Sequence, residues 1–254
     1  MRITELPDPW CRSPYLLGEH AQAEVRAAWT SPDAVLAVLD GPGRRCGLFG
    51  LGDPAALARL LEQAVREGRP ALAEIRYVTS QRGAFEAMDP ALAPGLGVAA
   101  DGSAWDWMWT AGPLTGDPDG AERLPLGTAT AAEVADFLSR GHPTASTAPD
   151  DERLIGWWGV RRGGRLRAVV GAILVTPGLP PHLVSLGVDP ATRGQGLAGV
   201  VMSAAVGDCL LVVPEVGRPM VSLGLYASND VARRVYARLG FRLEHELASR
   251  HRPG

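Results

Sequence analysis

The chain contains no lysine, so all 25 of its basic side chains other than histidine are arginine. A chain without lysine amines cannot form a Schiff base with a carbonyl substrate or with pyridoxal phosphate. It also cannot supply the lysine of a P-loop or the base of a Ser-Lys dyad. Phe, Tyr and Ile are scarce as well, and Asn229 is the only asparagine, a bias that GC-rich codon usage explains. Several classes of enzyme are therefore excluded at the outset.

Cysteine is scarce, and long apolar runs and an excess of charge of one sign are missing. The three cysteines have neither a disulfide-framework nor a metal-site spacing, so we expect reduced thiols and no bound metal. No apolar stretch approaches the thickness of a bilayer, and residues 1–5 do not begin a secretory signal. A net charge of −3 gives no electrostatic footprint for nucleic acid or an anionic membrane. We expect a cytoplasmic globular protein that binds neither.

The most informative segment that is present is a turn between two apolar stretches. Residues 182–188 are rich in Leu and Val and predict a buried strand, and residues 197–211 are long enough for a helix. The turn between them leaves backbone N–H groups unpaired at a helix N-terminus, where the helix dipole favours an anion. Gly194 and Gly196 lack side chains that would keep a pyrophosphate away from the backbone. The segment therefore predicts a phosphate-binding turn.

The motif Arg193-x-x-Gly196-x-Ala198 resembles the acyl-CoA-binding signature of the GNAT superfamily of N-acetyltransferases. That signature is Gln or Arg, two residues, Gly, one residue, then Gly or Ala. A second motif follows at the family's spacing, with Asn229 after a strand and Tyr236 on a helix that ends in Leu-Gly-Phe. The resemblance implies the GNAT fold, an α/β fold with a mixed sheet. A nicotinamide dinucleotide site fits poorly, because the glycines do not follow the dinucleotide fingerprint.

The expected order of elements in the second half also resembles the family. It comprises strand 122–126, helix 131–140 closed by Gly141, a hairpin with arms 157–161 and 166–175, strand 182–188, helix 197–211, strand 220–226, helix 229–239 and strand 241–247. The turn-rich segment 110–120 reads as an interdomain linker. We therefore predict an N-terminal domain over 1–118 and a GNAT domain over 119–254.

The first half is expected to be a smaller α/β domain with strand 34–40, helix 54–67 and strand 73–78. By analogy with two-half actinobacterial-type members, it would be a degenerate copy of the GNAT fold. Residues 47–52 look like a second glycine-rich phosphate turn, but they lack the Arg or Gln and the later motif, so we interpret them as structural. Trp105, Trp107 and Trp109 alternate along a strand and would share one face. Such a face is typical of a core or a domain interface, and a substrate-pocket wall is the alternative.

The resemblance implies direct attack of a substrate amine on the thioester of acetyl-CoA within a ternary complex. The pyrophosphate would bind the backbone amides of Arg193, Gly194, Gln195, Gly196, Leu197 and Ala198. The backbone of Leu186 and Val188 would pair with the pantetheine arm, and an amide there would polarise the thioester carbonyl. The side chain of Asn229 would contact the pantetheine as well, or cap the helix that follows. Tyr236, protonated at neutral pH, would give its proton to the leaving thiolate, unless it is only a packing residue.

The sequence leaves open which residue acts as the base and whether the chain is catalytic. His182 stands where one branch of the family carries a carboxylate base, and an imidazole titrates near neutrality; the alternative is a surface histidine at a strand end. His142 is a second candidate, and many members need no dedicated base.

The expected function is N-acetylation of a small amine or peptide acceptor by a monomer or homodimer. The alternative is a non-catalytic acyl-CoA-binding or regulatory module, although Asn229 and Tyr236 favour the enzyme.

Overall fold

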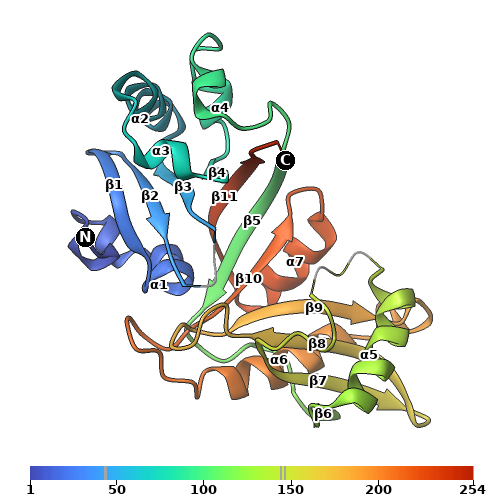
Figure 1. Cartoon of the computed structure of the whole chain (residues 1–254). Helices are drawn as coiled ribbons and strands as arrows, with labels where there is room; N and C mark the ends of the chain where they lie inside the picture. Colours follow the sequence, from blue (N-terminus) through green and yellow to red (C-terminus); the bar gives the residue numbers. More distant parts are fainter. Residues whose placement is uncertain (43–44, 144, 146, 254) are drawn as a thin grey trace. The chain divides into compact units, whose positions relative to one another are not determined.

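The computed structural model describes residues 1–42, 45–143, 145 and 147–253 (Figure 1). The chain packs into two compact units. Unit 1 comprises Met1–Trp107, Leu225–Asn229 and Leu243–Gly254, and unit 2 comprises Met108–Gly224 and Asp230–Arg242. Both combine helices with strands, and the predicted α/β class with a mixed sheet is confirmed.

The elements of the first part of the chain belong to unit 1. They are α1 (Pro14–His20), β1 (Glu24–Ser31), β2 (Ala34–Asp40), β3 (Gly47–Gly52), α2 (Pro54–Glu67), α3 (Ala71–Glu74), β4 (Tyr77–Gln81) and α4 (Ala84–Ala87), with short 3₁₀ turns at Ile3–Glu5, Trp10–Arg12 and Ala93–Leu96. Three strands have residues in both units: β5 (Ser103–Thr110), β10 (Val221–Tyr226) and β11 (Arg242–His251). The remaining elements lie in unit 2: β6 (Ala121–Leu124), α5 (Thr128–Gly141), β7 (Leu154–Arg162), β8 (Arg165–Ile173), β9 (His182–Val188), a 3₁₀ turn (Pro190–Thr192), α6 (Leu197–Cys209) and α7 (Asp230–Leu239).

The sheet of unit 1 is mixed. β1, β2 and β3 form an antiparallel meander, β3 then pairs with β4 in parallel, and β4 pairs in antiparallel fashion with β11 from the C-terminal end of the chain. The parallel pair requires a crossover, which α2 provides. The apolar side of α2 packs on the sheet, with Leu57 and Leu61 fully buried. The core of unit 1 thus lies between α2 and strands β1 to β4.

The sheet of unit 2 positions the predicted phosphate turn. β6, β7, β8 and β9 are successively antiparallel, and β9 pairs in parallel with β10 after the crossover helix α6. Gly163 and Gly164, with φ of 59° and 74°, make the tight turn between β7 and β8. α5 packs against β9, and α6 packs against β7 and β8 (Figure 1). The buried residues of α5 are Val134, Phe137 and Leu138.

Several predicted elements are confirmed with their bounds, namely strand 34–40, helix 54–67 and strand 182–188. Most others shift by a few residues at an end. The strand predicted at 73–78 is wrong, because a helical turn at Ala71–Glu74 occupies its start and β4 begins only at Tyr77. Ala, Leu and Glu favour a helix, and Pro70 already has helical backbone angles. The glycine-rich segment 47–52 forms strand β3, as its structural interpretation implies.

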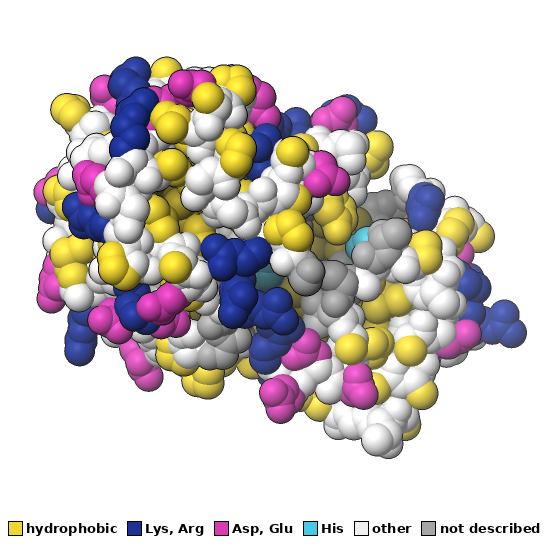
Figure 2. Space-filling model, turned by 45° about the horizontal axis from the view of Figure 1, so that its top comes forward, with side chains coloured by type: hydrophobic (Ala, Val, Ile, Leu, Met, Phe, Trp, Pro, Cys, Tyr) yellow, Lys and Arg dark blue, Asp and Glu magenta, His cyan; other side chains and the backbone are white. Residues whose placement is uncertain are grey.

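The predicted domain boundary between residues 118 and 119 falls in the loop between β5 and β6. Compact units and sequence domains need not coincide, so the division into 1–118 and 119–254 stays a prediction. The described part of the chain has no helix with the length and apolarity required to span a bilayer. Arginine and carboxylate side chains both occur across the face shown in Figure 2.

Candidate active site

The predicted phosphate turn is an open loop between β9 and α6. After Val188 the chain makes the 3₁₀ turn Pro190–Thr192 and then passes through Gly194 and Gly196, with φ of 80° and 78°. A Cβ placed on either glycine would meet no atom within 4 Å. The turn therefore requires glycine for its left-handed backbone rather than for space within the protein.

Six consecutive backbone amides of this turn, Arg193 to Ala198, have no hydrogen-bond acceptor among the described residues. The amides on either side are used: Thr192 donates to the Asp189 carbonyl at 2.9 Å, and Gly199 donates to the Gly196 carbonyl at 2.9 Å. Residues 193–196 are exposed, and no side chain caps the start of α6. The result is a row of free donors at the positive end of a helix dipole, an arrangement that favours binding of an anion.

The start of the turn is held by Asp189, which sequence reasoning missed as a site residue. One carboxylate oxygen accepts the Ala191 N–H at 2.9 Å, and the other accepts from Arg167 Nη1 at 2.5 Å. The Asp189 N–H also donates to the Arg167 carbonyl on β8 at 2.8 Å. The Ala191 N–H and then Arg167 lower the pKa of Asp189. Aspartate before proline is a known helix-start signal and was visible in the sequence, whereas its pairing with Arg167 depends on the strand register.

Strand β9 is irregular in its second half. Its register against β8 changes between Val184 and Gly187, so Ser185 and Leu186 form a bulge, and Ser185 adopts a positive φ of 56°. The Asp189 N–H donates to the Arg167 carbonyl on β8. In an antiparallel pair, this bond means that the neighbouring residues Val188 and Ala168 do not hydrogen-bond to each other. The N–H and C=O of Val188 therefore point away from β8. The parallel pairing with β10 covers His182 and Leu183.

Tyr236 is the one buried residue of α7, with 8% of its surface exposed. Burial raises the pKa of its phenol to about 12, and no described residue forms a hydrogen bond with the hydroxyl. The Leu-Gly-Phe sequence at the end of the motif forms the C-terminal cap of α7. Phe241 N–H donates to the Tyr236 carbonyl and Gly240 N–H to the Ala237 carbonyl, which is the Schellman ending of a helix. Val231, on the first turn of the same helix, is 67% exposed.

The last turn of α7 lies against the first turn of α6 within unit 2. A Cβ on Gly199 would lie 3.4 Å from the Leu239 side chain. Unit 2 therefore holds Tyr236, the edge of β9 and the phosphate turn in one compact body. Asn229 directly precedes α7 in the sequence but belongs to unit 1, where its N–H donates to the Tyr226 carbonyl at 2.9 Å.

The two candidate bases flank β9. His182 begins this strand, and its Nδ1 lies 2.9 Å from Ser222 Oγ on β10. His142 follows α5, its N–H donates to the Leu138 carbonyl, and burial lowers its pKa. Its Cβ would lie 3.7 Å from a Cβ placed on Gly187 of β9. A lowered pKa keeps His142 neutral near pH 7, a state in which imidazole can accept a proton.

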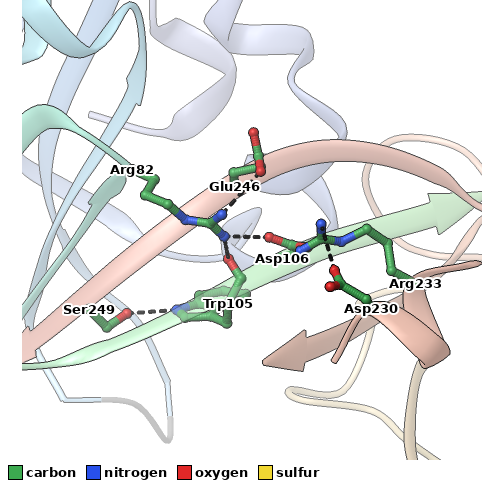
Figure 3. Close-up of polar contacts among 7 residues, drawn as sticks. All are labelled: Arg82, Trp105, Asp106, Asp230, Arg233, Glu246 and Ser249. Atoms are coloured by element: carbon green, nitrogen blue, oxygen red, sulfur yellow. Dashed lines mark hydrogen bonds and ion pairs between the residues drawn. The ribbon is translucent and has the colours of Figure 1, made fainter. Parts of the chain in front are cut away.

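The alternating tryptophans contribute to packing. Trp105 and Trp107 both contact the Tyr15 ring, with centroids 6.4 and 5.4 Å apart, and Trp107 is fully buried. On the same strand, the fully buried Asp106 accepts from Arg82 at 2.5 Å, and Arg82 also donates to Glu246 at 3.1 Å (Figure 3). This network joins β5 and β11 to the end of β4. The described residues contain no cluster of three or more metal-ligating side chains.

Comparison with protein families identifies the acetyltransferase (GNAT) family over residues 105–241. This match covers more than half of the chain and includes β9, the phosphate turn, α6 and α7. The chain therefore belongs to the GNAT family, which supports an acyl transfer function. The family match begins within β5, so residues 1–104 lie outside it.

Solved structures with the same fold come from distant organisms. One is a protein of Novosphingobium aromaticivorans assigned to the GNAT acetyltransferases, with 24% identity and a TM-score of 0.51 over 88% of this chain and 89% of that one. Another is a Drosophila protein with 16% identity and a TM-score of 0.52 over 86% of this chain and 74% of that one. At such identities the likeness establishes the fold alone. No curated protein matches the sequence.

Proposed function

We propose that this protein is an N-acetyltransferase that moves the acetyl group of acetyl-CoA to a primary amine of a small molecule or peptide. The observation that carries the proposal is the row of unpartnered amides from Arg193 to Ala198 at the start of α6. These amides belong to the motif Arg193-x-x-Gly196-x-Ala198, in a chain of the GNAT family. Their geometry suits a pyrophosphate, which accepts several hydrogen bonds at once.

The rest of the cofactor extends along β9 in this proposal. The pantetheine arm pairs with the backbone of Leu186 and Val188, and the outward direction of the Val188 N–H and C=O supports this role. An amide at the bulge polarises the thioester carbonyl, where negative charge develops during attack.

The reaction is a direct transfer. The amine nitrogen attacks the thioester carbonyl carbon, the carbon–sulfur bond breaks, and coenzyme A leaves as a thiolate that takes a proton from solvent. Tyr236 supplies the hydrogen bond to that sulfur. Its pKa of about 12 lies above the ordinary thiol value of about 8.5, so donation of a hydrogen bond is favoured over complete transfer of the proton. Tyr236 therefore stabilises the developing thiolate while remaining a phenol.

The attacking amine must lose a proton. We assign this role to His182, whose ring is oriented by the Nδ1 contact with Ser222 Oγ. His142 is the second candidate, since its lowered pKa keeps it able to accept a proton near neutrality. The two are distinguished by which substitution, His182→Gln or His142→Gln, removes the acidic limb of the kcat/KM profile.

Calorimetric titration with acetyl-CoA tests the proposal. Wild-type protein should bind with micromolar affinity, and Gly196→Trp should abolish binding because its side chain fills the pyrophosphate position. Gly68→Trp is the matched control, because Gly68 also has a positive φ of 58° and open space around it but ends α2 in unit 1. Binding with release of free thiol on addition of an amine supports the enzyme. Binding without turnover across an amine panel favours the non-catalytic alternative, and absence of binding overturns both.

A further inference from the structure

Four arginines lie on or beside the hairpin between β7 and β8, and they differ in whether a carboxylate neutralises them. Arg161 donates to Glu122 at 2.6 Å and to Glu133 at 2.5 Å. Arg167 is paired with Asp189. Arg162 and Arg165, at the tip of the hairpin, have no carboxylate partner among the described residues and are exposed.

Arg162 differs from Arg165 in its position. Its Nη1 donates to the Gln195 side-chain oxygen at 2.7 Å, and Gln195 stands between the two glycines of the phosphate turn. Arg165 contacts no described residue through a hydrogen bond or ion pair. The register of β8 against β9, Ala168 opposite Val188, places the hairpin beside the end of β9. A full positive charge is thus held at the rim of the six free amides.

A neutral amide oxygen leaves most of the binding capacity of Arg162 unused. A guanidinium carries five N–H donors, and its planar fork matches two oxygens of a phosphate. The backbone amides from Arg193 to Ala198 already provide donors for a diphosphate. The charge of Arg162 therefore suits a second, separate phosphate group on the same ligand.

We propose that Arg162 binds the 3′-phosphate on the adenosine of acyl-CoA and thereby gives the enzyme its preference for CoA over dephospho-CoA. The inference rests on the proposed function, since it takes acyl-CoA as the ligand. CoA and dephospho-CoA differ by this one phosphomonoester, so they isolate the contact. On binding, Arg162 exchanges its bond to Gln195 for one to the phosphate.

The experiment measures the affinities of CoA and dephospho-CoA for the wild type, Arg162→Gln and Arg165→Gln by calorimetry. Arg165→Gln removes the same charge three residues away and controls for the general electrostatic attraction of an anion. We expect the wild type to bind CoA about tenfold more tightly than dephospho-CoA, as a charge-assisted contact provides. Arg162→Gln should bring this ratio close to one, and Arg165→Gln should leave it near the wild-type value.

Other outcomes separate the possible failures. If Arg162→Gln weakens both ligands equally, Arg162 serves the diphosphate or only positions Gln195, and the inference is overturned. It is also overturned if the wild type binds both ligands equally well, or if Arg165→Gln removes the preference as completely as Arg162→Gln. If the wild type binds neither ligand, the proposed function itself fails. Both arginines are exposed, so melting temperatures near that of the wild type should accompany each variant.

Discussion

The two units contain the same kind of junction, a strand followed by a helix that crosses over to a parallel neighbour. In unit 1 the junction joins β3 to α2, and in unit 2 it joins β9 to α6. The first is closed by its own side chain, because the Asp53 carboxylate accepts the Ala56 N–H at 2.8 Å. The second has eight residues, Asp189–Gly196, before α6 and no capping side chain. A few residues within a shared arrangement thus decide whether the start of the crossover helix is capped or open.

Glycine has different functions in the two junctions. A Cβ on Gly52 would lie 2.1 Å from the Asp33 carbonyl oxygen, so glycine there permits two chain segments to approach closely. Gly194 and Gly196 have empty space around them and are needed for their positive φ. Glycine content alone therefore does not identify a phosphate site. The junction between β9 and α6 differs from the other in its greater length and in the absence of a capping side chain.

The largest expected effect comes from placing a carboxylate at the start of α6, as Asp53 stands at the start of α2. In Gly196→Asp, the carboxylate should occupy the start of α6 and repel the diphosphate. Asparagine and aspartate both tolerate a positive φ, so Gly196→Asn has the same shape without the charge. We expect acetyl-CoA affinity to be about 100-fold lower for Asp than for Asn, since two charges about 4 Å apart interact by a few kcal/mol near a protein surface. Calorimetric titration of the two variants measures the difference.

The reciprocal variant, Asp53→Ala, serves as the control. It removes the cap of α2 and should reduce the free energy of unfolding by about 1 kcal/mol, measured by urea denaturation. It should not add a second binding site, because the short junction offers no row of free amides. A stoichiometry of two acetyl-CoA per chain, in this variant or in the wild type, would contradict the comparison between the junctions.

A second difference concerns the helix that follows the next strand. After β4 this helix is α4, Ala84–Ala87, a single turn, whereas after β10 it is α7, Asp230–Leu239, which carries the buried Tyr236. Tyr236→Phe keeps the ring in place and removes only the hydroxyl. We expect kcat to fall about tenfold or more, with KM for acetyl-CoA unchanged, because the hydrogen bond forms as the thiolate leaves. Steady-state kinetics with a free-thiol readout tests this; equal loss of affinity and rate would indicate a packing role instead.

The same variant gives a pH prediction for stability. The folded-state pKa of Tyr236, about 12, lies above the ordinary value of about 10 for the unfolded chain. Its contribution is therefore fully present below pH 10 and is lost as the pH rises toward 12. The unfolding free energy of the wild type should fall relative to that of Tyr236→Phe over this range. A difference that stays constant would mean that the phenol is less buried than the fold implies.

Elements with strong local signals could be predicted from the sequence. Helix α2 has Asp53 as its cap, Pro54 in its first turn and a left-handed glycine at its end, and its bounds were predicted correctly. β11 was predicted too short, because its later residues are charged or small and are retained in the strand by pairing with β4. That pairing joins segments about 170 positions apart in the sequence, and register of this kind is set by tertiary contacts rather than by propensity.

The candidate site shows the same division between local and distant signals. The predicted phosphate turn is contiguous, so the sequence alone proposes its residues from their spacing, and it proposes the motif around Tyr236 in the same way. Arg162 and Arg167 could not, since they reach the turn from a hairpin whose alignment with β9 is a property of the sheet. Sequence therefore predicts the candidate binding backbone, and the structure adds the side chains that contact it.

The smallest expected effect concerns the anchoring of the open junction by Asp189. Asp189→Asn keeps an oxygen for the Ala191 N–H but weakens the ion pair with Arg167, so the turn should become less well ordered without losing any amide. We expect KM for acetyl-CoA to rise a few-fold and kcat to stay the same. Because the pKa of Asp189 is lowered in the folded state, the wild type should keep this advantage at neutral pH and lose it only as the pH falls through that pKa. The variant should show no such acidic loss, and a KM equal to the wild type at pH 7 would mean that the glycines and 3₁₀ turn order the loop without the ion pair.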